Sequence, residues 1–161
     1  MVSSRWTIDR FLDQLGSAKP VPGGGSAAAM AAALGVELGN KVGRIVLSRP
    51  RLSPKRRKRI QRDLRTLAKA SSQLRGLIRE DSEAYSQLVR ALASKRGIPA
   101  ARKRAIQCPL RICEAAVQGM KVLRGLSVSA GPYLASDLES AEALLQGSFR
   151  AARLMVEVNL K

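Results

Sequence analysis

The sequence predicts an all-α fold, a single-domain bundle of five or six helices with long antiparallel members over residues 1–161. Apolar residues recur with the helical period, and no run of residues alternates cleanly as a half-buried strand would. Hydrophobic residues make up 45% of the chain but aromatic residues only 3%, so the core must consist of Ala, Leu, Val and Ile. Such side chains favour closely packed helices, and the length suffices to bury a sizeable core.

Two helices are predicted in the first third of the chain. Thr7 is a suitable N-cap for a short first helix that ends at Gly16, with an apolar stripe of Ile8, Phe11, Leu12 and Leu15. A second helix is predicted from about residue 26 to 47. Its small residues recur at every fourth position: Ala27, Ala31, Gly35, Gly39 and Gly43. This face predicts a neighbouring helix pressed closely against it.

Three further helices are predicted after residue 52. Ser53 caps a long helix that starts at Pro54 and continues toward Ala93, with Gly76 as a candidate break. The next helix restarts at Pro99, and Pro109 should kink or restart it. Residues 125–134 are predicted to form a turn. Ser136 and Glu139 form a capping box for a last helix that reaches about Leu160.

The strongly basic charge implies a polyanionic partner. Lys and Arg total 29 against 12 acids, for a formal net charge of +17. The densest basic run consists of Arg49, Arg51, Lys55, Arg56, Arg57, Lys58, Arg59, Arg62, Arg65 and Lys69, with Asp63 as the opposing acid. It lacks interleaved aromatic residues and any helix-turn-helix pattern. Nucleic acid is therefore a partner that the sequence allows but does not favour, and most of the run is expected to be a solvated exterior.

Composition excludes several other classes of chemistry. The chain has no histidine, so acid–base chemistry must use carboxylates, Tyr, Lys or the substrate. Cys108 and Cys113 have neither a zinc nor a redox spacing and are interpreted as reduced core residues. No leader and no long apolar run is present, so we expect a soluble, cytoplasmic protein that does not associate with membranes.

A glycine-rich turn precedes the second helix and predicts a bound anion. Residues 20–26 read Pro-Val-Pro-Gly-Gly-Gly-Ser, so two prolines stiffen the approach to three glycines, Gly23, Gly24 and Gly25. Pro22 and the Ser26 hydroxyl complete this candidate ligand loop, because N–H groups at a helix start attract anions. The alternative is a flexible hinge with Ser26 as N-cap. Neither a Walker loop nor a dinucleotide-binding turn fits the residues.

Three other positions could carry chemistry, and each has a structural alternative. Asp81 precedes Tyr85 by one helical turn, so a carboxylate and a phenol share one face, although a surface acid beside a core Tyr is equally consistent. Ser136 and Asp137 open the last helix, where capping alone explains an acid. Asn159 lies at the apolar end of that helix, where its amide needs a partner, either in the core or in a ligand.

Taken in order, these segments resemble one known family. The matching pieces are Phe11 to Leu15, Pro20 to Ala28, Asp81 to Tyr85, Ser136-Asp137 and Asn159-Leu160. The chain resembles the formiminotransferase-cyclodeaminase C-terminal domain family, which includes stand-alone methenyltetrahydrofolate cyclohydrolases. One departure is visible, because the family usually has a Gly-Asn pair before its Ser-Asp, whereas Gly131 here precedes Pro132.

The resemblance implies an all-helical homodimer that binds a tetrahydrofolate derivative as substrate, without a metal. It makes Gly23, Gly24, Gly25 and Ser26 ligand-loop residues, and Asp81 and Asp137 catalytic candidates. Asp137 is assigned to the water or N5 side and Asp81 to positioning. The first expectation is hydrolysis of 5,10-methenyltetrahydrofolate to the 10-formyl product. Formiminotetrahydrofolate cyclodeaminase activity and a non-catalytic, polyanion-binding scaffold are the alternatives, and a polyglutamylated folate would suit the basic charge.

Overall fold

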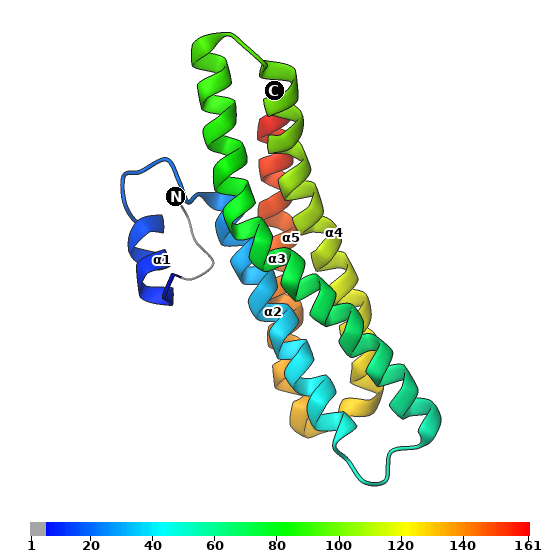
Figure 1. Ribbon diagram of the computed structural model, residues 1–161. Coiled ribbons are helices and arrows are strands. Elements are labelled where there is room, and N and C mark those ends of the chain that lie inside the picture. Colours follow the sequence, from blue (N-terminus) through cyan, green and yellow to red (C-terminus); the bar gives the residue numbers. More distant parts are fainter. Residues whose placement is uncertain (1–5) are drawn as a thin grey trace.

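The structure, a computed structural model, describes residues 6–161 and confirms the predicted all-α fold. Its elements are α1 (Ile8–Leu15), α2 (Gly24–Leu47), α3 (Pro54–Ser94), α4 (Ile98–Ala130), the 3-10 turn η1 (Pro132–Leu134) and α5 (Ala135–Leu160). No strand occurs within residues 6–161. The four long helices form an elongated bundle, and α1 stands to one side of it (Figure 1).

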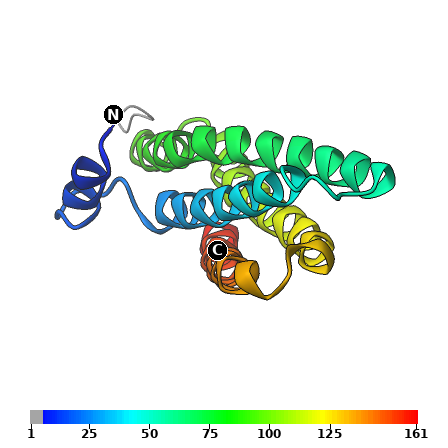
Figure 2. The same ribbon diagram turned by 90° about the horizontal axis from the view of Figure 1, so that it is seen from below.

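Helix α2 is the central member of the bundle, since it packs against α3, α4 and α5. The first turn of α2 lies beside Ile78 and Ser82 of α3. The last part of α3 extends past the start of α2, together with the start of α4 and the end of α5 (Figures 1 and 2). This offset brings four helices together around the glycine-rich turn.

Three glycines of α2 allow these close contacts, as the sequence predicts. A Cβ atom added at Gly35 would lie 2.9 Å from the Ala141 carbonyl oxygen of α5. A Cβ at Gly39 would lie 2.7 Å from a methyl carbon of Leu123, which belongs to α4. One at Gly43 would meet a side chain of α3 at 2.8 Å. Each glycine therefore accommodates a different neighbouring helix.

Most predicted helix boundaries are confirmed. The Thr7 hydroxyl accepts a hydrogen bond from the Arg10 N–H at 3.2 Å, and Gly16 follows the last residue of α1. Ser53 likewise caps α3, accepting from the Arg56 N–H at 3.4 Å. The candidate break at Gly76 is absent, and α3 is continuous through it, because one glycine inside a packed helix costs only about 1 kcal/mol.

The predicted boundary between the last two helices is wrong. Helix α4 continues to Ala130, so the chain turns only at Gly131 and η1 rather than over residues 125–134. Gly131 has φ +76°, in the left-handed region that favours glycine. The predicted capping box is also absent: α5 begins at Ala135 with Leu134 as its N-cap and no side-chain hydrogen bond. Ser136 therefore lies inside the helix rather than at the cap.

The apolar stripe predicted for α1 is only half buried. Phe11 is buried against the bundle and Leu15 is partly buried, but Ile8 is 70% exposed and Leu12 is 56% exposed. The helix therefore contacts the bundle through a narrow edge, and periodicity alone could not indicate how much of the stripe would find a partner.

Part of the basic run has a structural role at helix ends. The Arg49 guanidinium donates to the main-chain oxygens of Ser129 and Ala130 at 2.7 and 2.6 Å, where α4 ends. Arg57 donates to the Leu47 oxygen, at the end of α2, at 3.0 Å. Carbonyls in a last helical turn lack intrahelical partners, so these arginines satisfy them from outside.

Cys108 is buried and Cys113 partly buried, both as free thiols, as expected. Burial raises the pKa of the Cys108 thiol to about 11. None of the helices within residues 6–161 combines the length and the apolar character that a membrane crossing requires.

Candidate active site

A pocket of about 250 Å³ lies at the start of α2 and unites most of the predicted site residues. Helices α2, α3, α4 and α5 all contribute to its walls. Its lining residues are Pro20, Val21, Gly23, Gly24, Gly25, Asp81, Tyr85, Ala105, Met155, Val158 and Asn159. The sequence therefore predicted the glycine turn, one acid, one phenol and one amide of the same pocket. It did not predict the apolar wall that Met155 and Val158 provide.

The glycine turn forms the first turn of α2 rather than a loop before it. Gly23 is the N-cap and helix starts at Gly24, two residues before the predicted start. The alternative in which Ser26 is the N-cap is wrong, since Ser26 is a helical residue in that turn. Pro22, which follows a cis peptide bond, is buried and does not line the pocket.

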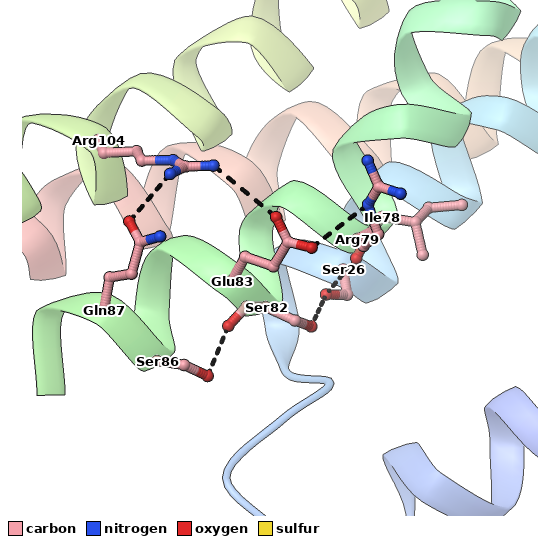
Figure 3. Close-up of polar contacts among 8 residues, drawn as sticks. All are labelled: Ser26, Ile78, Arg79, Ser82, Glu83, Ser86, Gln87 and Arg104. Atoms are coloured by element: carbon pink, nitrogen blue, oxygen red, sulfur yellow. Dashed lines mark hydrogen bonds and ion pairs between the residues drawn. The ribbon is translucent and has the colours of Figure 1, made fainter. Parts of the chain in front are cut away.

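Ser26 attaches this first turn to α3. Its side chain is fully buried, and its Oγ lies 3.0 Å from the Ile78 carbonyl oxygen and 2.9 Å from Ser82 Oγ (Figure 3). The same Oγ lies 3.0 Å from Oδ2 of Asp81. Because a hydroxyl carries one proton, Ser26 donates to one of these partners at a time. It therefore faces the protein interior, and any effect it has on a ligand passes through Asp81.

The Asp81 carboxylate takes the place of the anion that the glycine turn predicts. A Cβ atom added at Gly25 would overlap this carboxylate, so only glycine lets it approach the helix start. Burial raises the pKa of Asp81, while hydrogen bonds from the Ser26 hydroxyl and main chain oppose that rise. The site therefore holds an acid that is more basic than an exposed carboxylate and that still borders the pocket.

Asn159 is held in the pocket wall by a carbonyl that a proline leaves unpaired. Its Nδ2 donates to the Ala105 oxygen at 2.9 Å. In a regular helix that oxygen would accept from the N–H four residues later, but Pro109 has none. The helix does not restart at Pro109, contrary to one expectation. Instead, the proline creates an acceptor for Asn159, whose Oδ1 is then available to accept from a ligand.

Tyr85 lies one turn beyond Asp81 on α3 and is 44% exposed, so its phenol is at the pocket rim rather than in the core. Beyond this rim, Arg104 of α4 contacts α3 through Gln87 at 3.0 Å and Glu83 at 3.8 Å (Figure 3). These contacts hold the two helices that supply Asp81 and Ala105.

Ser136 and Asp137 lie elsewhere in the chain. Asp137 Oδ2 is 2.9 Å from Lys41 Nζ, an ion pair that links the start of α5 to the second half of α2. The rise along α2 from Gly24 to Lys41 is about 25 Å. Ser136 is exposed beside this pair. Within one chain the structure thus brings Asp81 to the glycine turn but not Asp137, whose catalytic role stays a prediction.

Comparison with known proteins identifies the family. The fold and site are those of a helical bundle in which one helix begins at a glycine turn and a partly buried acid lies beside that turn. The model of the Formiminotransferase-cyclodeaminase family matches residues 7–161. The chain belongs to this family, as its sequence motifs predicted.

Cyclodeaminases and a cyclohydrolase are both similar to this chain. The chain is 29% identical to the formimidoyltransferase-cyclodeaminase of Rattus norvegicus over 96% of its own length, yet it spans only 30% of that protein. It is 28% identical to the methenyltetrahydrofolate cyclohydrolase of Methylorubrum extorquens, covering 96% of this chain and 79% of that one. The solved formiminotetrahydrofolate cyclodeaminase of Thermotoga maritima has the same fold, with a TM-score of 0.91 at 24% identity over 97% of this chain and 79% of that one.

Proposed function

We propose that this chain hydrolyses 5,10-methenyltetrahydrofolate to 10-formyltetrahydrofolate. The observation that carries the proposal is the convergence of Asp81, Tyr85 and Asn159 on the glycine-started helix of a Formiminotransferase-cyclodeaminase family member. The relatives include both activities, since the chain covers 79% of the cyclohydrolase of Methylorubrum extorquens and 79% of the solved cyclodeaminase of Thermotoga maritima. Hydrolysis is the reaction we put first, and the experiment below separates it from deamination.

The pocket suits the pterin end of a folate. Its volume of about 250 Å³ is small for a whole folate, so the bicyclic ring would enter and the glutamyl tail would extend outside. Pterin rings carry N–H donors, for which Asn159 Oδ1 and the Asp81 carboxylate are acceptors. In the first turn of α2 the Ser26 N–H donates to Asp81, and the N–H groups of Gly24 and Gly25 suit the ring's oxygen.

In this proposal Asp81 is the acid–base group rather than the positioning group that the resemblance implied, because Asp81 is the acid that borders the pocket. The methenyl carbon is cationic and therefore already electrophilic, so the protein must mainly stabilise the cation and move a proton. As water adds to that carbon, the Asp81 carboxylate takes a proton from the water. When the hydroxy adduct collapses, the bond from carbon to N5 breaks, Asp81 returns its proton to N5, and the hydroxyl proton passes to solvent water, so one proton is released overall. The raised pKa of Asp81 favours the first of these transfers.

Asp137 can take part in the proposed reaction at the Asp81 pocket only if a second copy of the chain contributes it. We therefore propose that the protein is a homodimer. Asp81 and Asp137 are about 25 Å apart along one bundle, too far to act on one substrate. Lys41 pairs with Asp137 at 2.9 Å and holds its carboxylate near the start of α5.

The test is the loss of methenyl absorbance after protein is added to 5,10-methenyltetrahydrofolate. We expect hydrolysis well above the uncatalysed rate, and expect it to fall at least about a hundredfold in the Asp81→Asn variant. Asp13→Asn, on the exposed side of α1, is the matched control and should hydrolyse like the wild type. Release of ammonia from the formimino substrate without hydrolysis of the methenyl compound would instead show a cyclodeaminase. Binding without either reaction would show a scaffold.

A further inference from the structure

A stripe of cations runs along the outer face of α3, apart from the pocket. We define the basic stripe as Lys55, Lys58, Arg62, Arg65 and Lys69, all of them exposed. They repeat at intervals of three or four residues, so they lie on one side of the helix. The buried side of the same segment carries Ile60, Leu67 and Leu74 and is opposite. Figure 2 shows α3 along one outer edge of the bundle.

The structure separates this stripe from the rest of the basic run. Arg49 and Arg57 are used at helix ends, and Arg59 pairs with Asp63 at 3.8 Å. Within residues 6–161, by contrast, no member of the stripe forms an ion pair. Glu114 shares a shallow pocket with Lys69, without pairing with it. The stripe is therefore an uncompensated row of positive charge about 21 Å long.

We propose that the basic stripe binds the phosphate backbone of double-stranded nucleic acid. A duplex carries about one negative charge per 1.7 Å, the densest regular array of anions that such a row could meet. The run from residue 49 to 69 contains no aromatic side chain on which unpaired bases could stack, so a duplex fits better than a single strand. Binding would be independent of base sequence, because only phosphates are contacted.

Two other anionic partners fit the stripe less well. A membrane surface would need apolar side chains beside the cations, yet no large exposed hydrophobic residue lies between residues 35 and 84. The glutamyl tail of a bound folate would have to travel about 18 Å along α3 from Asp81 to Lys69 and then pass to the opposite face. The stripe is thus independent of the proposed reaction, and the two can fail separately.

The experiment measures anisotropy of a fluorescent duplex of about two helical turns as salt rises from about 50 to 200 mM. For five phosphate contacts, the logarithm of the binding constant should fall against the logarithm of salt with a slope of about −4.5. In the Lys58→Gln, Arg62→Gln, Arg65→Gln triple variant the slope should weaken by about 3, with a large loss of affinity at low salt.

The control removes the same charge and the same residue types elsewhere. Arg90, Arg96 and Lys103 are exposed and form no ion pair within residues 6–161, so their triple Gln variant should retain the wild-type slope. Equal slopes in the two triple variants would assign binding to overall charge and overturn the proposal. Tighter binding to anionic vesicles than to duplex at equal phosphate would also overturn it. Circular dichroism of all three proteins checks that the helices are intact.

Discussion

Asp81 is the residue on which the proposed chemistry depends most directly. Replacing it with Asn keeps the size of the side chain but removes the charge and the proton acceptor. We expect turnover of the methenyl substrate to fall at least about a hundredfold in Asp81→Asn, the loss typical of a removed proton-transfer group. Asp13→Asn should leave turnover unchanged, and equal rates in the two variants would contradict the assignment.

The raised pKa of Asp81 predicts how the stability of the protein depends on pH. Burial raises the pKa of Asp81 above its ordinary value of 3.8, so the folded protein binds this proton more tightly than the unfolded chain does. The stability that Asp81 contributes is therefore present below its unfolded pKa and is lost as pH rises through its folded pKa.

Asp81→Asn lacks this dependence. Chemical denaturation measures the free energy of unfolding of both proteins. The value for the variant should increase relative to that of the wild type as pH rises above about 4, and the difference should then become constant. A difference that shrinks with rising pH would contradict a raised pKa.

Pro109 acts on the pocket through the carbonyl it leaves free. Pro109→Ala supplies the missing N–H, which competes with Asn159 for the Ala105 oxygen. We expect KM to rise on the order of tenfold with kcat nearly unchanged, since about one hydrogen bond that orients a binding group is lost. Pro99→Ala is the matched control, because the N–H it restores lies in the first turn of α4 and has no such competitor. In an Asn159→Ala background, Pro109→Ala should have no further effect on KM.

The position of Gly25 accepts only glycine, which the composition of the chain does not reveal. In Gly25→Ala the new methyl group would overlap the Asp81 carboxylate and displace it. We expect a stability loss of about 1 to 3 kcal/mol together with loss of turnover. Gly147→Ala, also in a helix but with open space around it, should instead stabilise by up to about 1 kcal/mol. Thermal and denaturant unfolding of the two variants measure the contrast.

At the scale of the elements, the bundle is held by contacts between helix ends as well as by its core. Arg49→Gln removes both donors to the last turn of α4 and leaves two carbonyls without them. The expected cost is about 1 to 3 kcal/mol in the free energy of unfolding. Arg51 is an exposed neighbour of the same charge, and Arg51→Gln should change stability by less than about 0.5 kcal/mol. Similar losses in both would indicate a general charge effect.

At the scale of the whole molecule, the proposed shared site makes a testable demand on two chains. Asp81→Asn and Asp137→Asn should each be inactive alone. If one substrate contacts Asp81 of one copy and Asp137 of the other, refolding the variants together should restore about a quarter of wild-type turnover, because half the dimers would carry one intact site. Full activity of Asp137→Asn alone would show that the pocket of one chain is sufficient.

The sequence determined a large part of the fold and some of the site. Three local features were correctly predicted: the helical periodicity, the caps at Thr7 and Ser53, and the face of small residues on α2. Each depends on a pattern of residues that lie near one another in the sequence. The glycine turn lines a pocket, but the carboxylate beside it is that of Asp81 in the same chain, and a bound ligand there stays a prediction. The capping box at Ser136 failed because local spacing permits a cap without requiring one.

Only the tertiary structure decided which groups meet. Asp81 fills the anion position because α3 passes the start of α2, and Asn159 reaches Ala105 because Pro109 leaves an oxygen unpaired. The tertiary structure also separated the arginines that donate to main-chain oxygens at helix ends from the exposed cations of the basic stripe. Local sequence sets the conformation and the chemical character of each segment. Which partner a buried polar group finds depends on the packing of helices that are distant in the chain, since burial leaves it no water to bind.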